Sequence, residues 1–364
     1  MPSNPYRVFT GNSADVINAI RNQASTNFRD YVPVATPDAE SIRAVGAIIM
    51  DNPNLQNEFV QALIGRIALY IVESKMYDNP MSIFKRGILD YGETIEEVFV
   101  DLIDIQQFDP DTAAEQWMRR AIPDVRSAFH VMNFQKFYKA TVSHEQLRTA
   151  FLSVEGVNDL VEKITEAMFK SSNYDEYLVM KYMLMRKVLL GQITAQTVSA
   201  NASPSDMVKA FKGASNKLTF MSDAYNIAGV HAYTEKNDQY LFLDAQMDAT
   251  IDVDVLASAF NMDKAEFMGH RFLLDSFSSF DTARLAEIFA DDPNYVPISA
   301  QDMTALGKVV GIILDKNWFM VWDKLIEMRD VPNGEGLYWQ YWLHNWKIFS
   351  VSPFANAVVF TKGA

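Results

Sequence analysis

Residues 71–142 limit the possible folds of this chain more than any other segment does, because they combine strand-forming sequence with few large aliphatic side chains. Thr94 to Ile105 partly alternates in the manner of a half-buried strand, and Phe134 to Val142 offers a returning strand. Two strands without a core of their own are not stable in water. The segment therefore predicts a long hairpin-like excursion that rests on another surface, with contact candidates at Phe129, His130, Val131, Phe134, Phe137 and Tyr138.

The charged side chains in the middle of this excursion are all of one sign. Gly87 through Met118 contains no Lys or Arg, whereas it contains many Asp and Glu residues, and the whole chain carries a formal charge of -14. Nucleic-acid-binding proteins need clustered Lys and Arg, so the chain as a whole is not typical of them. The acidic run is either a solvated face or one half of an electrostatic contact with a basic surface.

The chain of 364 residues contains no cysteine, which excludes disulfides, thiolate metal ligands and cysteine nucleophiles. Its length allows one large domain or two to three medium ones. Met1 to Arg7 is not followed by an apolar stretch, so we expect no signal peptide. Val309 to Leu314 is too short to span a bilayer. We therefore expect a soluble intracellular product without a membrane partner.

Capping signals and periodicity predict most of the other elements. Ser13 can cap a first helix, and Pro53 can begin a second that ends near Tyr70. Between them, Pro33, Pro37 and Gly46 favour an irregular or extended arm over Asn27 to Asn52. The loose alternation of helices and strands indicates an α+β fold. The remaining predicted elements are a helix from a capping box at Ser143 and Gln146, a long helix within about 155–190 broken near 171–173, a helix after Ser203, two short helices within 252–269, and strands at 193–198, 240–243, 271–275, 309–314 and within 336–362.

Several motifs of enzyme and metal sites are incomplete. His144-Glu145 begins like a zinc-protease helix but lacks a second histidine four residues after the first. Gly307-Lys308 lacks the glycines of a phosphate-binding loop, and the five histidines are scattered singly. Residues 252–269 outline a helix-turn-helix with too little positive charge to read a DNA groove. We predict no catalytic, metal or cofactor site.

Five of the six tryptophans lie close together near the C-terminus, at Trp318, Trp322, Trp339, Trp342 and Trp346. With nearby carboxylates such as Asp315 and Asp323, they could form the aromatic cleft of a carbohydrate-binding or glycoside-hydrolysing protein. Their strand-like spacing favours core strands instead, since large aromatic side chains are usually buried. That interpretation predicts that Trp339 and Trp342 are largely buried.

Several blocks of sequence occur in the order found in one viral family. They are Val16 to Ile20, Phe28 to Pro33, Thr94 to Glu97, Asp252 to Ala257, Ala259 to Met262, Asp315 to Asp323, Gly336 to Trp339 and Ser350 to Ala357. From about residue 13 to residue 361 the chain resembles the major capsid proteins of phi29-like short-tailed phages. Several colinear blocks are far more specific than any single motif above.

This resemblance implies an α+β fold of the Hong Kong 97 type, with an N-terminal arm, an extended loop, a peripheral domain with a spine helix, and an axial domain. The corresponding ranges are 1–70 for the arm and leading helices, 71–142 for the loop, 143–202 plus 335–364 for the peripheral domain, and 203–334 for the axial domain. Some relatives carry an added immunoglobulin-like domain, which we do not expect because the sequence ends at Ala364. The fold's founding member cross-links itself through an extended-loop lysine. We expect no such bond, because Gly87 to Met118 contains no lysine.

The function implied is self-assembly into hexamers and pentamers of an icosahedral or prolate head that encloses double-stranded DNA, without enzymatic activity or cofactors. The partners implied are further copies of the chain, a scaffolding protein, a portal protein and a head decoration protein. The product would be part of the virion and assemble in the host cytoplasm. The carbohydrate-binding protein described above is the alternative.

We interpret the acidic run as docking on basic positions of a neighbouring copy. Charges at the edge of such a contact chiefly set register and association rate. The candidate contact residues are Glu93, Glu96, Glu97, Asp101 and Asp104 on the acidic side, and Arg119, Arg120, Lys181, Arg186 and Lys187 on the basic side.

Overall fold

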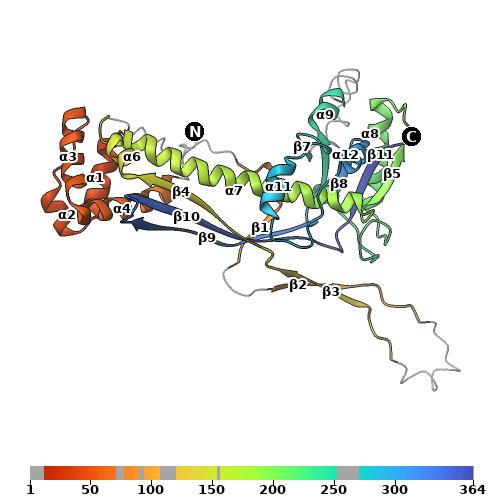
Figure 1. The fold of residues 1–364 in the computed structure, drawn as a ribbon. Coiled ribbons are helices and arrows are strands. Elements are labelled where there is room, and N and C mark those ends of the chain that lie inside the picture. Colours follow the sequence, from red (N-terminus) through yellow and green to blue (C-terminus); the bar gives the residue numbers. More distant parts are fainter. Residues whose placement is uncertain are drawn as a thin grey trace, which may run out of the picture. The chain divides into compact units, whose positions relative to one another are not determined.

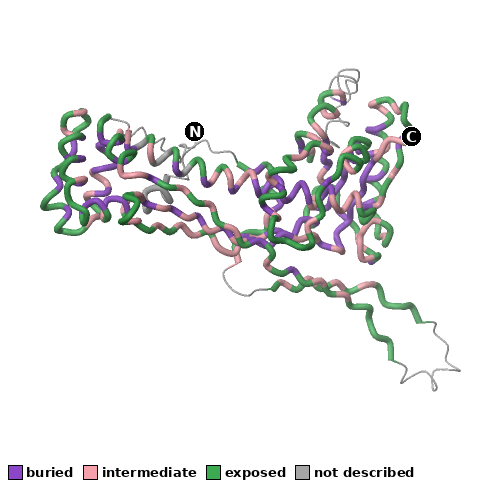
Figure 2. Tube along the Cα trace, in the orientation of Figure 1, coloured by how far each residue is buried: buried purple, intermediate pink, exposed green. Residues whose placement is uncertain are grey.

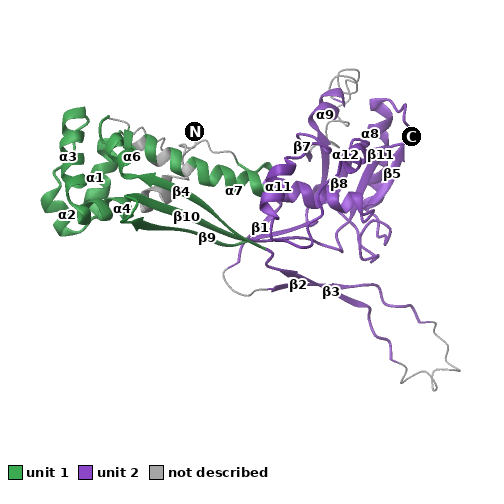
Figure 3. Ribbon diagram, in the orientation of Figure 1, with its two compact units in different colours: residues 1–80, 134–176, 323–346 green, residues 81–133, 177–322, 347–364 purple. Residues whose placement is uncertain are grey.

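The computed structural model describes residues 12–70, 78–89, 94–106, 120–153, 156–251 and 270–363. The chain divides into two compact units, each assembled from three separate segments (Figure 3). Unit 1 comprises residues 1–80, 134–176 and 323–346, and unit 2 comprises residues 81–133, 177–322 and 347–364. Both units contain helices and strands, in agreement with the α+β prediction.

Unit 1 begins with a group of helices. They are α1 (Ser13–Gln23), α2 (Thr26–Tyr31), α3 (Ala39–Asp51), α4 (Pro53–Tyr70) and α6 (His144–Ala150), followed by the first part of α7 (Gly156–Leu189). Pro53 is the first residue of α4, as predicted, and Ser143 and Gln146 form the predicted capping box of α6. The cap of α1 is Asn12 rather than Ser13, which is the first helical residue.

The irregular arm predicted for Asn27 to Asn52 is wrong, because this segment forms α2 and α3. Asp38 caps α3 by accepting a hydrogen bond from the Ser41 backbone N–H, directly after the prolines. Ile42, Val45 and Ile49 then form a buried apolar stripe. The prolines therefore separate two short helices rather than preventing helix formation.

The break predicted near residues 171–173 is also wrong, because α7 is continuous from Gly156 to Leu189. The polar residues there are satisfied without disturbing the helix. The Ser171 hydroxyl donates to the Ala167 carbonyl one turn earlier, and Ser172 is buried where its hydroxyl accepts from the Asn345 side chain. Polar residues therefore do not end this helix.

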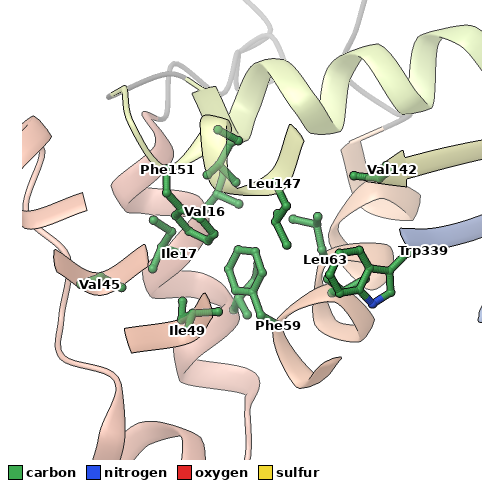
Figure 4. Close-up of a cluster of buried hydrophobic side chains, with 14 of the residues drawn as sticks. Val16, Ile17, Val45, Ile49, Phe59, Leu63, Val142, Leu147, Phe151 and Trp339 are labelled. Atoms are coloured by element: carbon green, nitrogen blue, oxygen red, sulfur yellow. The ribbon is translucent and has the colours of Figure 1, made fainter. Parts of the chain in front are cut away.

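Apolar side chains from the helices and strands of unit 1 form one buried cluster (Figure 4). Phe59 and Phe151 lie at its centre with ring centroids 5.3 Å apart. Trp339 joins the cluster and is 5% exposed, as predicted. Trp342 is less buried than predicted, because it lies on the opposite side of its strand, where the Lys139 ammonium is 5.9 Å from the ring centroid.

Close packing between α3 and Phe151 gives a testable prediction. A Cβ atom added at Gly46 would lie 2.5 Å from the Cβ and Cγ atoms of Phe151, which cannot move freely. We expect Gly46→Ala to lower the free energy of unfolding by roughly 2 kcal/mol through overpacking. Gly213, also helical, has no atom within 4 Å of such a Cβ. Gly213→Ala should therefore stabilise the protein by up to about 1 kcal/mol, and urea unfolding of both variants checks the contrast.

Unit 2 is built on a five-stranded sheet of order β5-β11-β8-β6-β7. Strand β11 (Ala357–Lys362) pairs parallel with β5 (Thr194–Val198) and antiparallel with β8 (Val309–Asp315). Strand β6 (Gln239–Asp244) pairs antiparallel with β8 and parallel with β7 (Arg271–Leu274). Helix α8 (Pro204–Leu218; Figure 1) is capped by Ser203, as predicted. Its Phe211 side chain packs against Phe360 of β11. The other described helices of unit 2 are α9 (Ala245–Ile251), α11 (Thr282–Ile288), α12 (Ala300–Leu306), the last part of α7, and the 3-10 turns η1 (Pro80–Phe84) and η2 (Lys236–Asp238).

A four-stranded sheet has the order β1-β9-β10-β4, from β1 (Lys85–Ile88), β9 (Phe319–Asn333), β10 (Tyr338–Val351) and β4 (Phe134–Ser143). Strand β4 therefore pairs with the aromatic strand β10 rather than with the strand at Thr94. That strand, β2 (Thr94–Val100), pairs with β3 (Val125–Val131) as a separate two-stranded ribbon. The helix-turn-helix outline at 252–269 lies outside the described residues.

Candidate functional site

The ribbon of β2 and β3 has two faces of different character. In its register Ile95 lies opposite His130, Glu97 opposite Ala128, and Phe99 opposite Arg126. These residues are buried or partly buried, whereas their neighbours along each strand are exposed, so burial follows the period of two expected for strands (Figure 2). The inner hairpin face consists of Ile95, Glu97, Phe99, Arg126, Ala128 and His130, and the outer hairpin face consists of Thr94, Glu96, Val98, Val100, Val125, Ser127, Phe129 and Val131.

The outer hairpin face is mainly apolar. Phe129 is 63% exposed, and the four valines of this face are all more than half exposed. Beyond the strands, Ile105 is 96% exposed and Ile122 is 81% exposed. Glu96 is the one acidic residue on this face among the described positions. An apolar strand surface left in water marks a site of association.

A buried polar cluster holds the inner hairpin face against the C-terminal segment of the same unit. The Nδ1 atom of His130 lies 2.7 Å from the Ser350 hydroxyl, and its Nε2 atom lies 3.2 Å from a Glu97 carboxylate oxygen. The Ser352 hydroxyl donates to the other Glu97 oxygen at 2.8 Å. His130 is 2% exposed, so these contacts satisfy a ring that has little access to water.

Three further contacts attach the hairpin to the rest of unit 2. The Phe99 ring stacks on Phe354 with centroids 5.4 Å apart, and the Arg126 guanidinium donates to the Ala228 carbonyl. The Asp101 carboxylate accepts from the backbone N–H and ring of His231, at 3.3 and 3.0 Å. The backbone N–H of Leu102, followed by His231, holds the pKa of Asp101 below its ordinary value. The hairpin is thus fixed along its inner face, and its outer face is left exposed.

The block Ser350 to Ala357 has a structural reason for its composition. Ser350, Ser352 and Phe354 receive the hairpin, as described above. Asn356 faces the other way, and its side-chain amide donates to the Thr234 hydroxyl at 3.2 Å. The Thr234 hydroxyl in turn donates to the buried Asp315 carboxylate at 2.6 Å. Burial raises the pKa of Asp315, and the hydrogen bonds from the Thr234 hydroxyl and the Asn317 backbone N–H oppose that effect.

Lys181 occupies a different environment from a surface contact residue. It is 1% exposed, and its ammonium donates to Asp275 Oδ1 at 2.5 Å and to the Ser279 carbonyl at 2.8 Å. The Tyr177 hydroxyl donates to the same Asp275 oxygen at 2.6 Å. Burial lowers the pKa of Lys181, and Asp275 partly offsets it. The Lys181 ammonium is therefore enclosed within its own chain rather than presented to a neighbouring copy.

The other sequence-predicted contact residues are dispersed. Glu96 lies on the outer hairpin face, Glu97 on the inner one, and Asp104 and Arg120 are exposed. Arg186 and Lys187 lie in the last turn of α7, where Lys187 donates to Gln192 at 2.7 Å and burial lowers its pKa. Glu93 and Arg119 lie outside the described residues. The described acidic residues therefore do not form one face. Sequence reasoning named His130 as a contact candidate, but it missed Ser350 and Ser352.

Comparison with known proteins assigns this chain to a protein family. A family model described as Phi29-like phage major capsid protein matches residues 17–361. The chain belongs to this family. It is 37% identical over 357 residues to the major capsid protein of Bacillus phage B103, covering 96% of this chain and 73% of that one. It is 25% identical over 358 residues to the major capsid protein of Streptococcus phage Cp-1, covering 94% and 92% of the two chains. The recognition made from the sequence blocks is confirmed.

Solved structures agree with the fold of this phi29-like capsid protein. A chain in the capsid of Staphylococcus phage Andhra aligns with a TM-score of 0.60 at 15% identity, covering 80% of this chain and 86% of that one. A chain in the structure of the head fiber and inner core protein gp22 of bacteriophage P68 aligns with a TM-score of 0.61 at 16% identity, covering 79% and 85%. The fold is therefore the predicted Hong Kong 97 type.

The carbohydrate-binding alternative finds no support. Trp318 is fully buried and Trp339 belongs to the core of unit 1, so neither lines an open cleft. In the part of the chain that the structure describes, no group of three or more His, Asp or Glu residues is placed to hold a metal ion. None of the described helices is both long enough and apolar enough to cross a membrane.

Proposed function

We propose that this major capsid protein assembles into hexamers and pentamers of an icosahedral or prolate head around double-stranded DNA, and that its role is structural rather than enzymatic. The observation that carries the proposal is the outer hairpin face. It exposes Phe129 and four valines, while Glu97, Phe99, Arg126 and His130 anchor the inner hairpin face within its own subunit. Such a surface becomes stable when a second copy of the chain covers it.

The proposed extended loop is shorter than 71–142. Since β4 pairs with β10 and packs Tyr138 and Val142 on the core of unit 1, we place the end of the loop near Asn133. The proposed arm (1–70), peripheral domain (143–202 plus 335–364, now with β4) and axial domain (203–334) otherwise keep the predicted ranges, except for β5 and β11. These two strands belong to the five-stranded sheet of unit 2 that contains β8, so we propose that they belong with the axial domain. The long helix α7 is the proposed spine helix.

Charge has a secondary part in the proposed contact. We propose that Glu96, Asp104, Arg120, Arg186 and Lys187 adjust register and association rate, because water and salt screen charges that remain in contact with solvent. Glu93 and Arg119 stay predictions of the same kind. The proposed partners are other copies of the chain, a scaffolding protein, a portal protein and a head decoration protein, with assembly in the host cytoplasm and a final place in the virion.

One substitution on the outer hairpin face tests this proposal. We expect Phe129→Asp to abolish particle formation, because a carboxylate would have to be buried in an apolar contact. The matched control is Phe220→Asp, at an aromatic residue that is 71% exposed and lies outside the hairpin. Negative-stain microscopy and sedimentation, with a scaffolding partner present, should show particles for the control and the unchanged chain only. Normal particles from Phe129→Asp would refute the role of this face.

A further inference from the structure

A pocket lies between helices α3 and α6 of unit 1 and takes no part in anchoring the hairpin. Its lining comes from α3, from α6 and from the two residues directly after α6. The pocket has a volume of about 260 Å³, which equals the space of about nine water molecules in the liquid. It is therefore large enough to receive side chains of a bound peptide but not a folded domain.

Basic side chains from both helices meet at this pocket. Arg43 comes from α3, and His144 and Arg148, which lie one turn apart on the same face, come from α6. The Arg43 Nε atom donates to the Leu152 carbonyl at 3.1 Å, which uses one of its five N–H groups. In the described part of the chain neither arginine forms a salt bridge, although Asp51 also lines the pocket. The chain has 46 acidic and 32 basic residues, so two arginines that converge without a carboxylate partner stand out against its overall charge.

The remainder of the lining is mainly apolar. It includes Ala47 and Met50 of α3, Phe151 and Leu152 after α6, and the backbone at Gly46. Phe151 also belongs to the buried cluster of unit 1 (Figure 4), whereas Leu152 is 51% exposed. A pocket that combines apolar walls with a few cationic groups suits a ligand that has both an apolar part and an anionic group.

We propose that this pocket binds an acidic peptide segment of a partner protein. A carboxylate of the peptide accepts hydrogen bonds from Arg43 and Arg148, and a neighbouring aliphatic side chain of the peptide packs on Met50 and Phe151. Guanidinium groups suit this task, because their planar N–H groups can form two parallel hydrogen bonds to one carboxylate. The apolar contact adds affinity by removing hydrocarbon surface from water.

The charges on the two helices favour a peptide over nucleic acid. The same helices carry acidic residues, with Glu40 and Asp51 on α3 and Glu145 on α6, all exposed. A phosphate backbone is recognised by basic residues that extend along a face, since affinity grows with the number of phosphates neutralised. Positive charge confined to one pocket and bordered by carboxylates instead matches a single acidic side chain.

Fluorescence anisotropy of a labelled peptide, titrated with the full chain, tests this proposal. The probe has blocked ends and carries glutamate, leucine and glutamate between glycines; two control peptides carry glutamine for glutamate or serine for leucine. We expect the probe to bind and each control peptide to bind at least about tenfold more weakly, because it lacks the charge-assisted hydrogen bonds or the apolar contact.

Two substitutions in the pocket should weaken binding of the probe at least about tenfold. Arg148→Gln removes a guanidinium that has no hydrogen bond of its own to lose in the described part of the chain, and Ala47→Phe fills the pocket without changing its charge. The matched control is Arg29→Gln, at an exposed arginine of α2 outside the pocket, which should change the affinity by less than about twofold. All three variants should keep the thermal unfolding temperature of the unchanged chain.

Three results would overturn the proposal. The first is no binding of the probe at ~1 mM, or binding that the glutamine peptide, Arg148→Gln and Ala47→Phe leave unchanged. The second is a short DNA duplex that binds more tightly than the probe and is released by Arg148→Gln, which would indicate a phosphate site. The third is weaker self-association of Arg148→Gln chains on their own in sedimentation, which would indicate a second copy as the occupant. The pocket lies entirely in unit 1 and peptide binding needs no particles, so these results do not depend on the proposed head assembly.

Discussion

Replacing Asp275 by alanine should destabilise the protein by roughly 3 kcal/mol, because it leaves the buried Lys181 ammonium without its carboxylate. Lys181 is 1% exposed, and among the described residues it keeps the Ser279 carbonyl as its hydrogen-bond acceptor in that variant. The loss should stay below the largest values for fully buried pairs, since the Asp275 side chain itself is 58% exposed. Urea unfolding of the two proteins at neutral pH measures the difference.

The matched control removes both charges. The double variant Lys181→Met/Asp275→Ala should recover most of the lost stability, because a flexible apolar side chain of similar length replaces the charged one. In the unchanged protein the Lys181 Nζ atom lies 5.0 Å from the centre of the Phe280 ring and 5.9 Å from that of the Tyr177 ring. These aromatic surroundings already suit an apolar side chain. If the double variant were no more stable than Asp275→Ala, the uncompensated buried charge would not be the cause of the lost stability.

The pair also makes a prediction about pH. Burial opposes ionisation of Asp275, but the hydrogen bonds from Lys181 and Tyr177 outweigh it and hold the pKa of its carboxyl below the ordinary value. A carboxyl of this kind contributes stability above its unfolded pKa of about 4 and loses it as the pH falls through the lower folded value. Below about pH 4, unfolding free energy should therefore fall more steeply with decreasing pH in the unchanged protein than in Asp275→Ala.

Local signals in the sequence were sufficient for much of the helical structure. Pro53, the Ser143 capping box and Ser203 each mark a helix start where the structure has one, since a cap depends only on residues within one turn. Between Asn27 and Asn52 the prolines favour an irregular arm, but the Asp38 cap starts a helix directly after them and is the stronger local signal. The burial of Lys181 follows from its position, because it lies one turn after Tyr177 and one turn before Met185 on the buried stripe of α7.

The candidate site depends on contacts that no local signal contains. The alternation of Thr94 to Asp101 separates two faces correctly, but each face mixes acidic and apolar residues, so the sequence does not indicate which one is anchored. That choice follows from Ser352, which is 255 positions away from Glu97. The same limit applies to β4, whose pairing with β10 is set by the core of unit 1 rather than by its own composition.

Adjacent glutamates on β2 should therefore respond very differently to the same substitution. Glu97→Ala removes the acceptor shared by His130 and Ser352, at 3.2 and 2.8 Å. Hydrogen bonds to a charged group contribute about 1.5–3 kcal/mol each. Among the described residues, the buried His130 ring would keep Ser350 as its hydrogen-bond partner. We expect a reduction in the rate of particle formation of at least about tenfold, because a loosened hairpin loses the orientation that repeated contacts require.

Glu96→Ala is the matched control, since this residue has the same charge but lies on the outer hairpin face without a partner among the described residues. Its loss removes only an exposed charge, so we expect a change of no more than about threefold in rate, decreasing further at high salt. Light scattering during assembly at two salt concentrations compares the two variants. Equal slowing would indicate that acidic charge itself, rather than the anchoring of the hairpin by Glu97, controls assembly. A selective effect of Glu97→Ala would instead place the controlling interaction inside the subunit, where it holds the outer hairpin face in position for the next copy.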